Sequence, residues 1–467
     1  MLCRKLSNVA TSARPALHRR LLPHNPGKLV ALAFAAWIAL GTAALMLPIS
    51  TAEDRSTGLV TALFTATGAS CGALAVVDTQ THWSTFGQVV IMILVQIGGL
   101  GIMTLASLLT LLVARKIGLR MQLVAASEAQ ALQLGDTKLV LKGVIGISLV
   151  VEAVVAFLLF ARFLLSYSYS PGKALFYSVF HAITSYNNAG YALYSDNLMS
   201  FQHDAWVLVP VMVGCVLGGL GFPVIFELTR ALRRARVRPR VRRTWTVHTK
   251  ITLWTYGLLV VVGFLTITAL EWGNPGTLGP MGAGAKMLNG MFASITARTA
   301  GFNSIDYGHA DSTSLLITDC LMIIGGGSAS SAGGIKVTTF ALLGFVMLAE
   351  IRGEPSVHVM GRRLPLDVQR QALTVTLLSV GAVVVGTVIL DLVSPAGFEK
   401  LLFEAISAFG TVGLSTGITP DLPAAGQLVL VGLMFLGRVG PIALASALAL
   451  RRKERRFEYP EERPIVG

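Results

Sequence analysis

The stretch Phe403-Glu-Ala-Ile-Ser-Ala-Phe-Gly-Thr-Val-Gly413 decides the fold, because three other segments of the chain repeat its pattern. These segments are Phe64-Thr-Ala-Thr, Phe180-His-Ala-Ile-Thr and Phe292-Ala-Ser-Ile-Thr, and the four phenylalanines are 116, 112 and 111 positions apart (180 − 64, 292 − 180, 403 − 292). A glycine follows each phenylalanine after 8 to 10 residues, at Gly72, Gly190, Gly301 and Gly413. Four matches at a near-constant period predict a fourfold internal repeat.

Long apolar segments flank every copy of the repeat. Those before the copies are Leu29–Leu47, Leu139–Ala161, Ile251–Leu270 and Ala372–Leu390, and those after are Phe86–Ala114, Trp206–Ile225, Leu315–Leu348 and Leu428–Leu450. About 20 apolar residues span a bilayer as a helix, whereas the dozen or so residues of each repeated segment are too few and are typical of re-entrant elements. We therefore expect an all-α polytopic membrane protein with four helix–pore-loop–helix repeats, arranged with pseudo-fourfold symmetry around one central pore.

The composition agrees with a membrane protein. Of the 467 residues, 53% are hydrophobic and 13% are charged, about half the charged fraction of a soluble domain. The net charge of +14 is concentrated at the two ends of the chain and in residues 230–243, which contain eight arginines. This asymmetry predicts a bacterial inner-membrane protein with both termini in the cytoplasm. It also accounts for the arginines without a nucleic-acid partner, since no aromatic residues interleave them.

The repeat divides the chain into six expected regions. A cytoplasmic basic N-terminus (1–28) and a cytoplasmic C-terminus (451–467) enclose four pore repeats, at 29–114, 139–229, 250–350 and 372–450.

The loops after the short helices carry the expected chemistry. A potassium ion crossing a membrane exchanges its hydration shell for backbone carbonyls, and neighbouring carbonyls that point the same way need backbone angles that glycine tolerates. The four glycines could instead serve close helix packing, but that alternative does not explain why each one follows a short helix. The candidate filter residues are Ser70, Cys71, Gly72, Asn188, Ala189, Gly190, Thr299, Ala300, Gly301, Thr411, Val412 and Gly413.

Three of these segments resemble a known family. Phe180 to Gly190, Thr299-Ala-Gly-Phe-Asn303 and Ser407 to Gly417 are similar to the second, third and fourth filter segments of the Trk/Ktr/HKT potassium-transport superfamily, and Tyr459 to Gly467 resembles the end of its KtrB branch. The resemblance implies a homodimeric membrane subunit that transports K⁺, with Na⁺ as a candidate activator. It also implies a cytoplasmic ring of nucleotide-binding RCK subunits of the KtrA type, and we expect anionic lipids at the basic face.

The first repeat departs from the family pattern. Cys71-Gly-Ala-Leu74 is one residue shorter than the usual Cys-x-Thr-Gly-Leu. Either Gly72 or Ala73 then occupies the position of the filter glycine, and Gly72 is the favoured choice. The shortening puts the strength of selection for K⁺ over Na⁺ in question.

Two elements are candidates for a gate. Five glycines interrupt the third inner helix, and because each costs about 1 kcal/mol in a helix, we expect the helix to break there. The resemblance implies that this segment is a mobile intramembrane loop under the filter, and we favour this over a packing kink at a dimer interface, because a kink needs only one or two glycines. Arg438 lies within the last apolar segment, where a charge faces a cavity or a structural partner. The gate residues are Gly325, Gly326, Gly327, Ser328, Ser330, Ser331, Gly333, Gly334, Lys336 and Arg438.

Other polar residues in apolar segments are weaker candidates. Arg298 could brace the third filter segment against a carboxylate such as Asp306. Glu152 and Asp319 are expected to have structural pairings or interfacial positions, and His181 is expected to pack or face the helix dipole.

Two other classes of function were weighed. A secondary cation transporter coupled to Na⁺ or H⁺ with alternating access is the alternative, although such proteins show inverted repeats, whereas these repeats share one orientation. The sequence lacks metalloprotease, nucleophile-elbow and P-loop motifs, so we expect neither an enzyme nor a nucleotide site in this chain.

The orientation of the arginine cluster can be tested with a single cysteine. Thr244→Cys should react with a membrane-impermeant thiol reagent only after the cells are opened, because the positive-inside asymmetry places residues 230–243 in the cytoplasm. Labelling in intact cells, measured against a variant without added cysteine, would contradict this topology.

Overall fold

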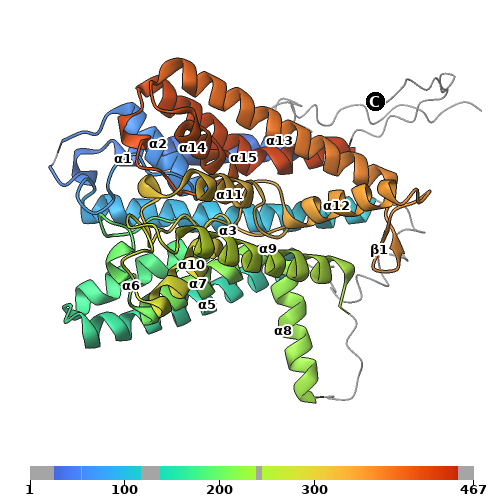
Figure 1. Ribbon diagram of the computed structural model, residues 1–467, viewed down its shortest axis with the longest axis horizontal. Coiled ribbons are helices and arrows are strands. Elements are labelled where there is room, and N and C mark those ends of the chain that lie inside the picture. Colours follow the sequence, from blue (N-terminus) through green and yellow to red (C-terminus); the bar gives the residue numbers. More distant parts are fainter. Residues whose placement is uncertain (1–25, 54, 117–136, 238–244, 451–467) are drawn as a thin grey trace, which may run out of the picture.

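The computed structural model describes residues 26–53, 55–116, 137–237 and 245–450. The N-terminal and C-terminal basic segments, except for residues 26–28, and residues 238–244 of the arginine cluster lie outside them. The long helices run side by side along one axis of the molecule (Figure 1). Two short strands, β1 (His358–Val359) and β2 (Arg362–Arg363), pair antiparallel near the end of one helix.

Each expected unit begins with a long helix and continues with a short one; one further long helix completes the first and fourth units, whereas two shorter helices complete the second and third. The first unit comprises α1 (Pro26–Leu45), α2 (Leu59–Cys71) and α3 (Thr85–Lys116), and the second comprises α5 (Thr137–Ser166), α6 (Pro171–Tyr186), α7 (Ala205–Leu220) and α8 (Phe222–Val237). The third comprises α9 (Val247–Glu271), α10 (Ala283–Thr296), α11 (Ser312–Ile323) and α12 (Val337–Ile351), and the fourth comprises α13 (Leu366–Val393), α14 (Phe398–Gly410) and α15 (Ala424–Leu450). Single 3₁₀ turns occur at Pro48–Ser50, Met199–Phe201, Tyr307–His309 and Thr419–Asp421.

The outer helices of the second, third and fourth units are long and apolar enough to cross a membrane. They are Leu141–Ser166 within α5, Val247–Glu271 and Leu366–Val393. The inner helices of units two and three are not continuous, and the breaks in them shape the centre of the molecule.

The second inner helix bends where the sequence predicts a single span. The expectation of one helix over Trp206–Ile225 is wrong, because α7 and α8 meet at an angle of 103°. Gly221 separates them with φ 89° and ψ 148°, a combination that is essentially restricted to glycine. As a result, α8 leaves the bundle at a steep angle (Figure 1). The predicted break in the third inner helix is confirmed, since α11 ends at Ile323 and α12 begins at Val337.

The repeated phenylalanines anchor the four short helices. Phe64, Phe180, Phe292 and Phe403 are each 0% exposed. Full burial of a large apolar side chain contributes about 1.5–3 kcal/mol, so each short helix is held in the core by its own anchor. The periodic phenylalanines in the sequence therefore reflect the packing of the four short helices in the core.

Three inner helices cross the end of a short helix at a glycine. In each case an added Cβ would overlap the backbone carbonyl of the residue six positions after the repeated phenylalanine. The pairs are Gly98 with Ser70, Gly218 with Tyr186, and Gly437 with Phe409. These contacts fix the inner helices against the loops that follow the short helices.

The close contact at Gly218 predicts a specific loss of stability. Gly218→Ala should destabilise the protein by about 1–3 kcal/mol, as overpacking of a tight contact does, and should lower the midpoint of thermal unfolding in detergent. Gly257→Ala is the matched control, because Gly257 lies on an exposed face of α9 with nothing within 4 Å of an added Cβ. Equal midpoints for the two variants would show that the contact at Gly218 is unimportant.

Candidate functional site

A residue with left-handed backbone angles follows each short helix within three positions, and we call it the left-handed cap of that segment. The φ values are 67° at Gly72, 52° at Asn188, 75° at Thr299 and 51° at Thr411. Left-handed angles cost a residue with a Cβ roughly 1–2 kcal/mol. Strain of this kind is concentrated at functional sites, where the surrounding structure enforces it. The four caps therefore mark the point at which the predicted filter segments begin.

Two residues further on, three of the four segments have a glycine with positive φ. The values are 69° at Gly190, 71° at Gly301 and 99° at Gly413. These glycines turn the chain directly after the left-handed cap.

The first segment follows a different register from the one expected. One backbone hydrogen bond marks equivalent positions, since the N–H groups of Ala73, Ala189 and Val412 each donate over 2.9 Å to the carbonyl five residues earlier. Gly72 is thus equivalent to the cap residues, and the filter-glycine position is held by Leu74, which lies outside the positive-φ set. The preference for Gly72 at the filter-glycine position is wrong. Gly72 is the left-handed cap, and the residue two positions after it, Leu74, is not a glycine. The Leu74 carbonyl accepts a hydrogen bond of 3.1 Å from the Tyr191 hydroxyl.

The four segments touch one another in a closed sequence. A Cβ on Gly72 would lie 2.8 Å from the Asn188 carbonyl oxygen, and one on Gly190 would lie 2.7 Å from the backbone of Gly301. A Cβ on Gly301 would overlap the carbonyl of Val412, and one on Gly413 would lie 3.2 Å from the carbonyl oxygen of Ala73. The first segment thus contacts the second, the second the third, the third the fourth, and the fourth the first.

The polar atoms at this meeting point are neutral oxygens. The side-chain hydroxyls of Ser70, Thr299 and Thr411 are buried and have no hydrogen-bond partner among the described residues. The predicted filter residues include no Asp or Glu, and no group of three or more His, Cys, Asp or Glu that could hold a metal ion occurs in the described chain. Neutral oxygens from carbonyls and hydroxyls are suited to a monovalent cation such as K⁺.

The loop between α11 and α12 lies against the filter segments. The Ser331 hydroxyl and the Asn188 side chain are 2.9 Å apart, and a Cβ on Gly333 would overlap the Thr411 hydroxyl. A Cβ on Gly325 would lie 3.4 Å from the Thr299 methyl group. The predicted gate residues therefore contact three of the four segments.

Backbone hydrogen bonds join the same loop to the bend in the second inner helix. The Gly327 N–H donates to the Gly219 carbonyl over 2.8 Å, and the Phe222 N–H donates to the Ala329 carbonyl over 3.2 Å. The two helix breaks thus satisfy each other's polar groups, as irregular backbone within a membrane requires.

Two cations are bound to carbonyls of this loop, the buried Arg438 and the partly buried Lys336. Arg438 donates from Nη1 to the Ser331 carbonyl, and Lys336 donates from Nζ to the Ala332 carbonyl. Neither forms an ion pair with a carboxylate among the described residues. The partner of Arg438 is therefore a carbonyl of the loop itself. This contact supplies the structural partner that the sequence analysis considered for Arg438.

Arg298 braces the third segment differently from the expectation. Its guanidinium donates to the Tyr256 carbonyl over 2.7 Å and to the Gly325 carbonyl over 3.2 Å, and it lies 3.9 Å from the centre of the Tyr256 ring. The suggested pairing with Asp306 is wrong, because that carboxylate accepts from the Gly308 N–H and from His309. Arg298 thus joins the filter segment to the candidate gate loop and to α9.

The remaining polar residues of the sequence analysis have structural contacts. His181 is buried, with Nδ1 2.7 Å from the Tyr177 carbonyl and Nε2 accepting from the Leu193 N–H. Asp319 is 3% exposed, so its position is interior rather than interfacial, and its Oδ1 has no partner among the described residues. Glu152 is paired with an amide, Gln96.

Sequence reasoning missed one carboxylate at the fourth segment. Glu404 is 0% exposed and accepts hydrogen bonds from the Ser415 hydroxyl at 2.6 Å, the Thr416 N–H at 3.0 Å and the Thr419 hydroxyl at 2.7 Å. It therefore fixes the chain that leaves the filter. The sequence could have indicated it, because Glu404 directly follows Phe403 just as His181 directly follows Phe180. Both side chains accept a hydrogen bond from a backbone N–H beyond the filter glycine of their own segment.

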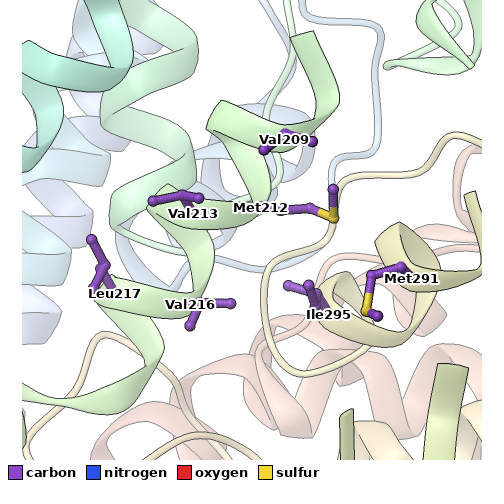
Figure 2. A pocket seen from close by; sticks show the side chains of 7 residues that line it. All are labelled: Val209, Met212, Val213, Val216, Leu217, Met291 and Ile295. Atoms are coloured by element: carbon purple, nitrogen blue, oxygen red, sulfur yellow. The ribbon is translucent and has the colours of Figure 1, made fainter. Parts of the chain in front are cut away.

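An apolar pocket of about 310 Å³ lies between α7 and α10. Figure 2 shows Met212 and Val213 of α7 on one side of it and Met291 and Ile295 of α10 on the other. All of its lining residues are apolar. It offers no oxygen to a cation, so the ion site is to be sought at the loops.

Comparisons with known proteins identify the family of this chain. The sequence matches the family model TrkH, described as "Cation transport protein", over residues 24–457. It is 38% identical over 443 residues to the Ktr system potassium uptake protein B of Bacillus subtilis, covering 95% of this chain and 97% of that protein. It is 34% identical over 453 residues to the potassium/sodium uptake protein NtpJ of Enterococcus hirae, covering 95% and 97%. The crystal structure of the potassium transporter TrkH from Vibrio parahaemolyticus is similar in fold, with a TM-score of 0.71 and 16% identity, covering 92% of this chain and 85% of that one.

Proposed function

The chain belongs to the TrkH family of cation transport proteins, and on this basis we propose that it is the ion-conducting membrane subunit of a potassium-uptake system. K⁺ passes between the four loop segments. The observation that carries the proposal is the closed sequence of contacts from Gly72 through Gly190, Gly301 and Gly413 back to Ala73. The relatives reported above are ion transporters, and no catalytic role is proposed.

In the proposed filter, backbone carbonyls replace the water around the ion. The carbonyls come from the cap residues and the residues that follow them, and the strained backbone directs them toward a shared axis. Neutral oxygens bind a monovalent cation strongly enough for entry and weakly enough for release. The repeats share one orientation, which supports a pore over alternating access.

The first segment is the weak quarter of this filter. Leu74 stands where the other three segments have a positive-φ glycine, and its carbonyl is engaged by Tyr191. A filter with one dissimilar quarter discriminates less between ions of different size. We therefore propose that K⁺ is favoured over Na⁺ less strongly than by a filter with four glycines, and that Na⁺ acts as an activator.

The loop between α11 and α12 is the proposed gate. It touches three filter segments and is held by Arg438, Lys336 and the α7–α8 bend. Its glycines permit a second conformation at low cost, whereas a cation at this position repels a permeating ion. Movement of the loop together with Arg438 would open the path.

Partners are proposed from the relatives. The name Ktr system is given to a potassium uptake protein of Bacillus subtilis, and for this chain we propose a homodimer that binds a cytoplasmic ring of nucleotide-binding RCK subunits of the KtrA type. The eight arginines of residues 230–243 supply positive charge for anionic lipid head groups. This arrangement corresponds to a bacterial inner membrane with both termini in the cytoplasm.

The filter is tested by ion flux into proteoliposomes. The purified chain should carry K⁺ and Rb⁺ faster than Na⁺, and Gly413→Ser should lower K⁺ flux or the K⁺/Na⁺ ratio, because residue 413 has a φ of 99° and an added Cβ would crowd the Ala73 carbonyl. Gly397→Ser is the matched control, since Gly397 precedes the same short helix with φ −59° and open space around it. Equal flux and equal ratios in both variants would contradict the filter.

The gate predicts a gain of flux. Repulsion between a unit charge and K⁺ at about 4 Å is on the order of 4 kcal/mol at an effective dielectric constant near 20, and removal of half that barrier speeds passage more than about tenfold. Arg438→Ala, or deletion of residues 329–332, should therefore raise K⁺ uptake and reduce its dependence on an RCK partner. Arg352→Ala, which changes an exposed arginine, should have no effect. Reduced flux from normal amounts of folded Arg438→Ala and deletion protein would leave only a structural role.

A further inference from the structure

A buried carboxylate lies directly behind the second filter segment. Glu152, on α5, is 6% exposed. Both of its carboxylate oxygens accept hydrogen bonds of 3.0 Å from Gln96 Nε2, and Oε1 lies 3.4 Å from Asn187 Nδ2. Three helices, α3, α5 and α6, thus meet at this carboxylate through two amide side chains.

The orientation of both amides follows from a backbone carbonyl. The Ile183 carbonyl can only accept, so the Asn187 atom 2.9 Å from it is the donor Nδ2. The same Nδ2 lies 2.7 Å from Gln96, whose facing atom must then be the acceptor Oε1. The other end of Gln96 is therefore Nε2, which donates to Glu152. Every contact of the carboxyl group in the described chain comes from a donor, which matches its ionised form.

Asn187 connects this network to the filter. It is the C-cap of α6, and the next residue is Asn188, whose left-handed backbone begins the second filter segment. A Cβ on Gly99 of α3 would overlap Asn187 Oδ1, so the asparagine is clamped from the other side. The carboxylate is thus one hydrogen bond away from the residue that precedes the filter.

The charges around the filter give this carboxylate its significance. Arg298 and Arg438, which are buried, and Lys336, which is partly buried, are bound to carbonyls of the candidate gate loop, and each disfavours a cation in the path. Glu152 forms no ion pair among the described residues, so its field is not cancelled by a contacting cation. A buried charge without such a partner is costly, and the contact with Asn187 places this one beside a filter segment.

We propose that Glu152 is an affinity-determining residue for the transported cation, its negative charge held behind the second filter segment by Gln96 and Asn187. The charge lowers the K⁺ concentration needed for half-maximal transport without contacting the ion. This inference rests on the proposed function of the loops as a K⁺ filter.

The test separates charge from shape. Glu152→Gln keeps the size and one acceptor oxygen but removes the charge, whereas Glu152→Asp keeps the charge and shortens the side chain. We expect the glutamine variant to raise the half-saturating K⁺ and Rb⁺ concentrations by about threefold or more, and the aspartate variant to stay closer to the unchanged protein. A purely structural role lowers the stability of both variants and leaves the half-saturating concentrations of the folded proteins unchanged.

Glu271→Gln is the matched control. Glu271 is also a fully buried carboxylate that accepts only from neutral groups, namely Thr277, Asn274 and the Asp311 N–H. These partners belong to the loops at the end of α9 and not to a filter segment. We expect its half-saturating K⁺ concentration to remain that of the unchanged chain.

Each outcome of the flux experiment in proteoliposomes is decisive. Absence of K⁺ flux through the unchanged chain overturns the proposed function itself. Saturable flux with equal half-saturating concentrations in Glu152→Gln and the unchanged protein overturns only this inference. Failure of Glu152→Gln to accumulate as folded protein, with a folded Glu271→Gln, also counts against it, because the charge would then serve stability. Protection against thermal unfolding by added K⁺, measured in detergent, should weaken in the same order as transport.

Discussion

Within a membrane, every backbone N–H and carbonyl needs a partner inside the protein, and this requirement shapes the whole centre of the molecule. Four short helices end inside the bundle and release irregular segments there. The chain between α11 and α12 is irregular as well, and so is the bend at Gly221. These elements supply each other's partners, as the bonds from Gly327 to Gly219 and from Phe222 to Ala329 illustrate. No one of the breaks could exist without the others.

Close approach of backbones makes this mutual pairing possible. The inner helices pass the ends of the short helices at Gly98, Gly218 and Gly437, where a side chain would collide with a carbonyl. The anchoring phenylalanines hold the short helices from the opposite side in the core. Positions are thereby fixed tightly enough for the segments to keep strained left-handed caps. Strain of this kind persists only where the surrounding structure enforces it.

The buried charged side chains around this centre bind neutral groups. The cations Arg298 and Arg438 bind backbone carbonyls, and in doing so they tie the gate loop to the filter and to the last helix. The carboxylates Glu152, Glu404 and Glu271 accept from amides, hydroxyls and N–H groups. None of these residues forms an ion pair among the described residues. Their charges are consequently not neutralised by a contacting group of opposite charge in this part of the chain.

The sequence by itself determined the class, the order of elements and one of the two helix breaks. Long apolar segments and the asymmetric distribution of charge indicate a membrane protein. The regular spacing from Phe64 to Phe403 predicts four units, because each unit buries one phenylalanine at the equivalent position. The glycines after Ile324 predict an interruption because the cost of glycine in a helix is local and additive. These are properties that residues have before they meet any distant neighbour.

Tertiary structure decided the remainder. The bend at Gly221 lies in an apolar run that reads as one span, and it is required only by the loop packed against it. The register of the first segment depends on which residue takes the cap of α2, and the sequence reasoning weighed only Gly72 and Ala73 for a position that the structure gives to Leu74. The partners of Arg298 and Glu152 lie on other helices, 42 and 56 positions away. Hydrogen bonds between distant segments leave no periodic trace in a sequence, since their geometry is set only when the helices pack.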